Sequence, residues 1–194
     1  MPRKIYQRAI EFITDYDSES INIGGGEPTL HPDFWGILGE CMGSFDYVWL
    51  ATNGSQTKIA LKLAKMAKNG VIGCDLSRDQ WHDPIDPRVV EAFTKKITEN
   101  GENDHREIRD VSSSNFLSPF RNPKKGGSTE NCPCNDTIIM PDGKLKACGC
   151  HDAPIVGDIF KGYSFNRDLL DLNDGECWQK NREIYIELGL TKPE

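Results

Sequence analysis

The chain has 194 residues, of which 27% are charged and 37% hydrophobic, and these values are typical of a folded protein with one main domain and room for a small appended module. No apolar run approaches the ~20 residues that cross a bilayer, and the N-terminal MPRKIYQRAIEF lacks the apolar core of a signal peptide, so we expect a cytoplasmic protein without a membrane partner. The net charge of −7 argues against nucleic acid as the main partner, because proteins that bind nucleic acid concentrate Lys and Arg on one face.

Residues 1–115 alternate between helical and strand patterns. Apolar residues at helical spacing predict a first helix over 2–16, and SINIG predicts a short buried strand over 20–24. Short strands then alternate with longer helices, which predicts βα units around a mostly parallel sheet. The elements expected next are a helix over 33–41, a strand over 46–52, a helix over 55–70, a strand over 71–76, a helix over 86–100 and a less hydrophobic strand over 106–112.

This alternation begins on a helix, although a parallel unit is normally entered from a strand. Met1 lies directly before that helix. Either the helix is an unpaired cover at the edge of the sheet, or a strand and its loop are absent in front of it. We favour the second alternative, which predicts an N-terminally incomplete domain.

A parallel sheet places its ligands at the carboxyl ends of its strands, where this chain carries glycines and polar residues. The segment GGGEP at 24–28 follows the first strand, Asn53 follows the second, and Ser77 with Asp79 ends the third. Glycines expose main-chain N–H and C=O groups that a Cβ would shield, and the proline stiffens the loop that presents them. Glu27 would either take up an ammonium group or orient the loop. A lone GGG is more typical of a tight turn, but the recurring polar groups favour a site for a small zwitterion.

The pattern changes beyond residue 115. A connector rich in Pro, Gly and Ser over 116–131 leads into 132–194, where TIIM and KLKAC flank Pro141-Asp142-Gly143. Two apolar runs around such a triplet predict a β-hairpin. Two helices are expected in the tail, around 164–172 and 175–188. The expected organisation is therefore a main domain over 1–115, a linker over 116–131 and a hairpin with helices over 132–194.

Four of the seven cysteines lie on either side of this hairpin. Residues i and i+2 of a strand share a face, and a hairpin brings its two ends together, so four sulfurs can converge there. Such thiolates suit tetrahedral zinc or an iron–sulfur cluster, and the alternative is reduced pairs that merely pack or one disulfide. Cys41 and Cys74 lie in apolar patterns and are expected in the core. The predicted metal ligands are Cys132, Cys134, Cys148 and Cys150.

These residues, in this order, resemble the radical S-adenosylmethionine (SAM) superfamily. GGEPTLHPDF is similar to its GGEP motif, LATNGS to its third strand with an Asn-Gly turn, and CDLSRDQWHDP to its fourth strand and the following loop. The segment CPCNDTIIMPDGKLKACGC resembles the cysteine-bearing SPASM or twitch segments of the family. The resemblance covers about residues 5–160. It implies an α/β fold, a partial and N-terminally incomplete (βα) barrel, with a C-terminal cysteine hairpin and a helical tail.

The resemblance also implies the cofactors SAM and a 4Fe-4S cluster. Gly25, Gly26, Glu27 and Pro28 would hold the methionyl amine of SAM; Asn53, Ser77 and Asp79 would contact the rest of it; the hairpin cysteines would hold an auxiliary cluster or zinc. The family's CxxxCxxC motif, which ligates the cluster that cleaves SAM to a 5′-deoxyadenosyl radical, is absent from the sequence. We therefore expect a truncated radical SAM enzyme, inactive by itself, whose partners are an unknown substrate and a reductase or a subunit that supplies the missing cluster segment.

Two alternatives stay open, and no catalytic residue is assigned in any of them. A non-catalytic metal-binding partner or recognition protein derived from the same fold would keep the hairpin site. A small zinc-stabilised α/β protein unrelated to SAM would explain the cysteines but would leave the glycine loop without a use. One fold supports many reactions, so no substrate is assigned.

Overall fold

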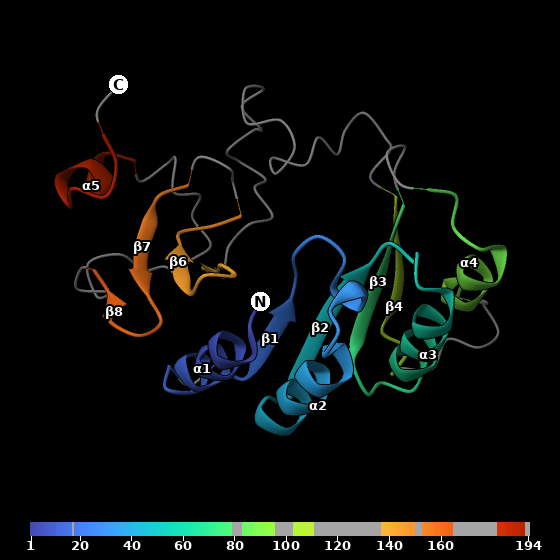
Figure 1. Ribbon diagram of the computed structural model, residues 1–194. Helices are drawn as coiled ribbons and strands as arrows, with labels where there is room; N and C mark the ends of the chain where they lie inside the picture. Colours follow the sequence, from blue (N-terminus) through green and yellow to red (C-terminus); the bar gives the residue numbers. More distant parts are fainter. Residues whose placement is uncertain are drawn as a thin grey trace. The chain divides into compact units, whose positions relative to one another are not determined.

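The computed structural model describes residues 1–16, 18–78, 83–95, 103–110, 137–149, 153–164 and 182–192 (Figure 1). Contacts within the chain divide it into two compact units. Residues 13–116 form one of them, which we name the parallel-sheet unit. Residues 1–12 and 117–194 form the other, which we name the meander unit.

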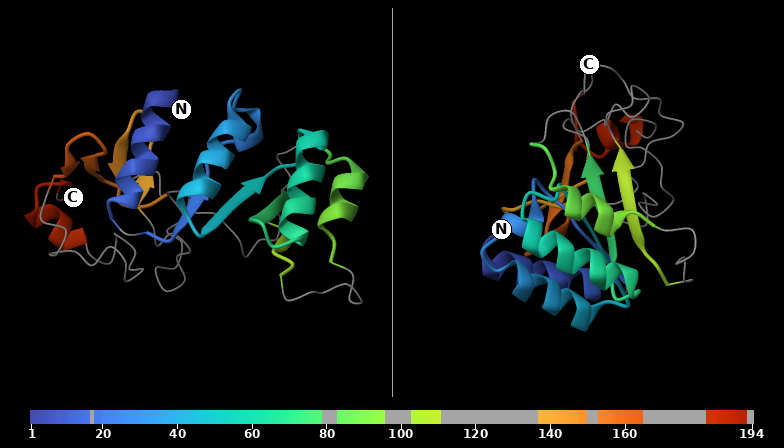
Figure 2. Two further views of the ribbon diagram at one scale, coloured as in Figure 1. Left: turned by 90° about the horizontal axis from the view of Figure 1, so that it is seen from below. Right: turned by 90° about the vertical axis from the view of Figure 1, so that its right-hand side faces the viewer.

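The parallel-sheet unit contains a four-stranded parallel sheet in the order β1-β2-β3-β4 among the described residues. Because the strand order follows the chain order, right-handed crossovers put the intervening helices on one face, as Figures 1 and 2 show. This confirms the predicted α/β class with a parallel sheet, whereas the four described strands do not close into a barrel. The elements are β1 (Ser20–Ile23), the 3-10 helix η1 (Pro28–Leu30), α2 (Phe34–Ser44), β2 (Tyr47–Thr52), α3 (Thr57–Lys68), β3 (Gly73–Arg78), α4 (Pro87–Phe93) and β4 (Arg106–Asp110).

The two faces of this sheet differ in polarity. The face toward the helices is apolar and buried, and its members include Val48, Leu50, Thr52, Cys74 and Leu76. Parallel sheets usually bury apolar side chains on both faces. Here the register gives the other face a polar composition, and we name it the polar face; it carries Tyr47, Trp49, Ala51, Asp75, Ser77, Glu107 and Arg109.

A buried ion pair fixes the start of β4. Arg106 Nη2 lies 2.6 Å from Asp104 Oδ2, and Arg106 Nε donates to Asp104 Oδ1 at 2.9 Å. Arg106 Nη1 also donates to the carbonyl of Ala92 in α4 at 2.5 Å, so the pair connects β4 to the helix before it. The hydrogen bonds from Arg106 lower the pKa of Asp104 to about 2.

The meander unit is built on an antiparallel sheet in the order β5-β6-β7-β8. The β5–β6 pair is the predicted hairpin, with Ile138 opposite Lys146. Its turn contains Gly143 at φ +88°, a conformation that favours glycine. The prediction of a hairpin around Pro141-Asp142-Gly143 is therefore confirmed. The elements are α1 (Arg3–Thr14), β5 (Ile138–Ile139), β6 (Lys144–Lys146), β7 (Ile155–Asp158), β8 (Gly162–Tyr163) and α5 (Arg182–Glu187).

The first helix, α1, packs with the meander unit as far as Phe12. Ala9 and Phe12 lie in one hydrophobic cluster with Leu145 and Val156, and Arg8 Nε donates to the carbonyl of Ile159 at 3.0 Å. From the sequence we expect this helix in the main domain over 1–115, whereas the contacts group residues 1–12 with residues 117–194. The expectation of an absent strand before α1 stays a prediction.

The tail is described only in part. Residues 165–172 of the helix expected around 164–172 lie outside the described residues, and α5 lies within the one expected over 175–188. The helix expected over 86–100 is α4, which ends at Phe93. Residues 96–102, which include the end of the expected helix, lie outside the described residues. Across the described ranges, no helix combines the length and apolar character needed to span a membrane.

Candidate functional site

Glu27 fastens the glycine loop to the end of β2. Its Oε1 accepts hydrogen bonds from the backbone N–H of Thr29 at 3.1 Å, from Thr29 Oγ1 at 2.5 Å and from Thr52 Oγ1 at 2.9 Å. Its Oε2 accepts from the backbone N–H of Asn53 at 2.6 Å. Both carboxylate oxygens therefore have partners within the chain. Of the two expected roles for Glu27, this geometry supports orienting the loop.

The three glycines before Glu27 present an uncovered main chain. Gly24, Gly25 and Gly26 are exposed, and a Cβ built on any of them would meet no atom within 4 Å. Gly25 has φ +134°, a backbone conformation that residues with an L side chain rarely adopt. The loop thus offers open main-chain groups, and its C=O oxygens can accept hydrogen bonds from the ammonium of an amino-acid-like ligand.

The other expected cofactor contacts lie at the ends of neighbouring strands. Pro28 begins η1, directly after its N-cap Glu27. Asn53 Oδ1 accepts from the backbone N–H of Ser55 at 2.9 Å, so this oxygen closes the turn after β2. Ser77 follows Leu76, which pairs with Thr52, so Ser77 comes directly after the last residue pair of β2 and β3, as Asn53 does on the other strand. Asp79 lies outside the described residues.

Two threonines were missed by the sequence interpretation. Thr29 and Thr52 are both buried, and both donate their hydroxyl groups to Glu27. Thr52 Oγ1 also accepts from the N–H of Gly54 at 3.1 Å, so it connects the Glu27 carboxylate with the turn after β2. For Thr52, the signal available in the sequence was its place as a hydroxyl residue at the end of a largely apolar strand, YVWLAT.

The sequence interpretation also missed a charged cluster on the polar face. Asp75 is 5% exposed, and its two oxygens take different partners, Trp49 Nε1 at 3.3 Å and Arg109 Nη2 at 3.2 Å. Burial raises the pKa of Asp75, while Arg109 acts in the opposite direction. The charged segment REIRD was the available signal, because side chains alternate along a strand and Glu107 and Arg109 then lie on one face of β4.

The predicted metal site cannot be assembled from the described residues. Cys148 is 2% exposed and belongs to the hydrophobic cluster of the meander unit. The other predicted ligands, Cys132, Cys134 and Cys150, lie outside the described residues. Within the ranges that are described, no group of three or more His, Cys, Asp or Glu side chains is placed to hold a metal ion. A metal at the hairpin therefore stays a prediction.

Cys41 and Cys74 are core residues, as predicted. Both are buried, and Cys74 lies on the helix-covered face of β3. Burial raises the pKa of Cys41 to about 11, and it raises that of Cys74 further. Neither thiol has the low pKa of a reactive or metal-binding cysteine.

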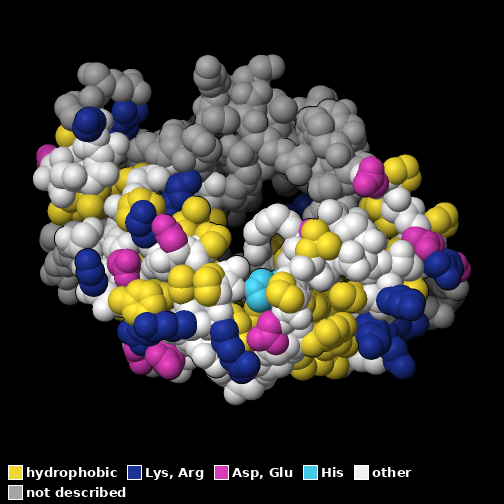
Figure 3. All heavy atoms as spheres, viewed as in Figure 1, with side chains coloured by type: hydrophobic (Ala, Val, Ile, Leu, Met, Phe, Trp, Pro, Cys, Tyr) yellow, Lys and Arg dark blue, Asp and Glu magenta, His cyan; other side chains and the backbone are white. Residues whose placement is uncertain are grey.

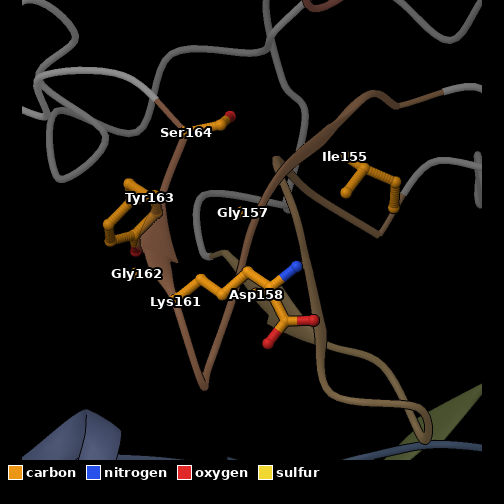
Figure 4. Close-up of a pocket in the computed structure, with 7 residues that line it drawn as sticks. All are labelled: Ile155, Gly157, Asp158, Lys161, Gly162, Tyr163 and Ser164. Atoms are coloured by element: carbon orange, nitrogen blue, oxygen red, sulfur yellow. The ribbon is translucent and has the colours of Figure 1, made fainter.

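Two surface hollows are lined by residues outside the glycine loop. One, of about 320 Å³, is lined by Trp35, Lys62, Lys65 and Met66 between α2 and α3, where Figure 3 shows hydrophobic side chains bordered by basic ones. Lys62 Nζ lies 5.5 Å from the centre of the Trp35 ring. The other, of about 420 Å³, lies along the β7–β8 hairpin of the meander unit (Figure 4); its lining includes Asp158, Lys161, Tyr163 and Ser164.

Comparison of the chain with known protein families, with curated proteins and with solved structures finds no match. The assignment of a function therefore depends on the geometry of the glycine loop and on the motifs in the sequence.

Proposed function

We propose that the parallel-sheet unit is part of a (βα) barrel of the radical SAM type and that its glycine loop binds SAM. The observation that carries this proposal is the uncovered main chain of Gly24, Gly25 and Gly26, held in position by Glu27. The consecutive strand order, with helices on one face, supports it further, because this is the winding that a barrel of parallel strands requires.

The residues at the loop fit an amino-acid-like cofactor. The backbone of Gly25 and Gly26 would receive the methionyl amine, because the Glu27 carboxylate already has partners within the chain. Asn53 and Ser77, together with Asp79 of the undescribed segment, would contact the remainder of SAM. When bound, SAM and a reduced 4Fe-4S cluster would supply radical chemistry, and the protein would position and shield the reactants.

The proposed class is a radical SAM enzyme with an unidentified substrate. The sequence contains no CxxxCxxC motif, so we expect SAM binding without reductive cleavage when this chain acts by itself. A reductase, and a subunit or segment that supplies the cluster, would complete the reaction. The cysteine hairpin would hold an auxiliary iron–sulfur cluster or zinc.

Isothermal titration calorimetry of the full chain with SAM tests the proposal. Gly26→Ala adds one methyl group at the loop, and Gly39→Ala adds one on α2; neither new Cβ meets an atom within 4 Å, so both variants should fold. We expect Gly26→Ala to weaken SAM binding about tenfold or more, which is about 1.4 kcal/mol, and Gly39→Ala to leave it unchanged. Absence of binding to the wild-type chain, or equal affinities for both variants, would refute the assignment.

A non-catalytic binding protein derived from this fold is the second candidate, and the missing CxxxCxxC motif favours it. Both candidates predict that the chain alone does not cleave SAM. They differ when a segment or subunit that carries CxxxCxxC is added, because only the truncated enzyme should then form 5′-deoxyadenosine. After anaerobic reconstitution with iron and sulfide, with a strong reductant added, the chain alone should form no 5′-deoxyadenosine. Formation of 5′-deoxyadenosine would show that the essential site is present after all.

A further inference from the structure

Arg109 is held in a fixed orientation on the polar face of the parallel sheet. Its Nη2 lies 3.2 Å from Asp75 Oδ2, and its guanidinium carbon lies 5.2 Å from the centre of the Trp49 ring. Trp49 is held in turn, because its Nε1 donates to Asp75 Oδ1 at 3.3 Å. The buried Asp75 thus positions both the guanidinium and the ring on which it stacks.

The guanidinium keeps donors available for a ligand. Its side chain is 42% exposed, and an arginine has five N–H donors in a planar arrangement. Among the residues that the structure describes, Asp75 is the one acidic partner of Arg109. Stacking on Trp49 and pairing with Asp75 reduce the conformational freedom that the side chain would lose on binding a ligand.

We propose that Arg109 binds the acidic group, a carboxylate or a phosphate, of a small substrate on the polar face. A planar guanidinium pairs with either group through two parallel hydrogen bonds. This inference rests on the proposed function only in naming the ligand as the substrate, because anion binding at Arg109 can be measured without SAM.

The neighbouring charges limit the number of acidic groups that this ligand can carry. Glu107 is exposed on the same face of β4 as Arg109, and it pairs with Asp75 of β3 in the sheet. Two carboxylates beside one guanidinium would repel a polyanion such as nucleic acid. This repulsion is smaller for a molecule with a single acidic group, which the fixed guanidinium would contact directly.

Nuclear magnetic resonance of the full chain labelled with nitrogen-15 provides the test. The indole N–H signal of Trp49, assigned with Trp49→Phe, reports on the ring that stacks with Arg109. Inorganic phosphate and acetate are titrated separately at constant ionic strength, with chloride as the balancing ion. We expect a saturable shift of this signal with at least one of the two probes, and the comparison decides between a phosphate and a carboxylate substrate.

Variants identify the residue that binds the anion. Arg109→Gln should abolish the shift, and Arg109→Lys, which keeps the charge but not the planar donors, should weaken binding several-fold. Glu107→Gln should tighten it, since a repelling charge is removed. Arg88→Gln is the matched control, because Arg88 is an exposed arginine on α4 paired with Asp86, and it should leave the titration unchanged.

Several results would overturn the inference. An equal shift in a separate titration with sodium chloride would mean an adventitious ion only, and an unchanged titration of Arg109→Gln would place binding elsewhere. A titration of the wild-type chain with SAM separates the two proposals. Normal SAM binding without anion binding by the wild-type chain refutes the substrate site alone, whereas anion binding at Arg109 without SAM binding refutes the proposed function alone.

Discussion

The carboxylate of Glu27 accepts the backbone N–H of Asn53 at 2.6 Å, which joins the loop after β1 to the turn after β2. The same carboxylate accepts the hydroxyl hydrogen of Thr52, a buried residue at the end of β2. The glycine loop is therefore positioned by the neighbouring strand. This connection fixes the proposed SAM contact relative to Asn53.

Replacing Glu27 by Gln should loosen the glycine loop. Glutamine keeps the shape but has one acceptor oxygen, so it cannot satisfy Thr29, Thr52 and Asn53 together. We expect the free energy of unfolding to fall by about 2 kcal/mol, measured by urea denaturation. Hydrogen exchange at the Asn53 amide should accelerate.

Glu91→Gln is the control for this change, because Glu91 is exposed on α4. Its effect on the free energy of unfolding should be within about 0.5 kcal/mol of zero. Equal stabilities of the Glu27 and Glu91 variants would mean that the carboxylate does not hold the loop.

The ion pair of Asp104 with Arg106 should make stability depend on acid pH. The pKa of Asp104 is lowered from its ordinary 3.8 to about 2, so its contribution is fully present above about pH 4 and is lost as the pH falls toward 2. Asp104→Asn should lower the free energy of unfolding at pH 7 by about 3 kcal/mol, because it leaves the charge of Arg106 buried. The difference from wild type should narrow between pH 4 and pH 2.

Chemical denaturation at several pH values measures this difference. Asp86, whose pKa is also lowered to about 2 by Arg88, is present in both proteins, so its titration cancels in the comparison. A difference that stays constant down to pH 2 would contradict the assigned pKa of Asp104.

Phe12→Ala should destabilise the meander unit. Phe12 is buried in the cluster with Leu145 and Val156, so its removal leaves a cavity and should cost about 3–5 kcal/mol. Hydrogen exchange should accelerate at Leu145 and Val156 more than at Leu50 in the parallel sheet. Glu11→Ala on the same helix should cost less than about 1 kcal/mol, because Glu11 is 66% exposed and its pairing with Arg8 is solvated. Comparable losses from both variants would argue that α1 does not pack through Phe12.

Cys148→Ala should remove the metal predicted at the hairpin. Alanine suits this buried position, and it lacks the sulfur that would serve as a ligand. Elemental analysis of anaerobically purified protein should find iron or zinc in the wild type and much less in the variant. Cys74→Ala, at a buried cysteine of the parallel sheet, should keep the wild-type metal content. If Cys148→Ala retains its metal, Cys148 is not a ligand.

Local patterns predicted most of the elements in the parallel sheet. The strand expected over 46–52 is β2 at Tyr47–Thr52, and the helix expected over 55–70 is α3 at Thr57–Lys68. The third strand differs, since β3 extends to Arg78 beyond the expected end at residue 76. Ser77 and Arg78 interrupt the apolar pattern, but they pair with Arg109 and Asp110 of β4. Pairing between strands therefore extended β3 where its own hydrophobicity ended.

The sequence by itself determined the alternation of helices and strands in the parallel sheet, the hairpin around Gly143 and the glycine loop after β1, because periodicity and turn chemistry depend on residues close together in the chain. Only the tertiary structure decided that Glu27 binds the end of β2, that Phe12 packs with Tyr163, and that Asp75 meets Arg109. Each of these contacts joins residues far apart in the sequence. They depend on strand register and on burial in a shared core, which no local pattern encodes.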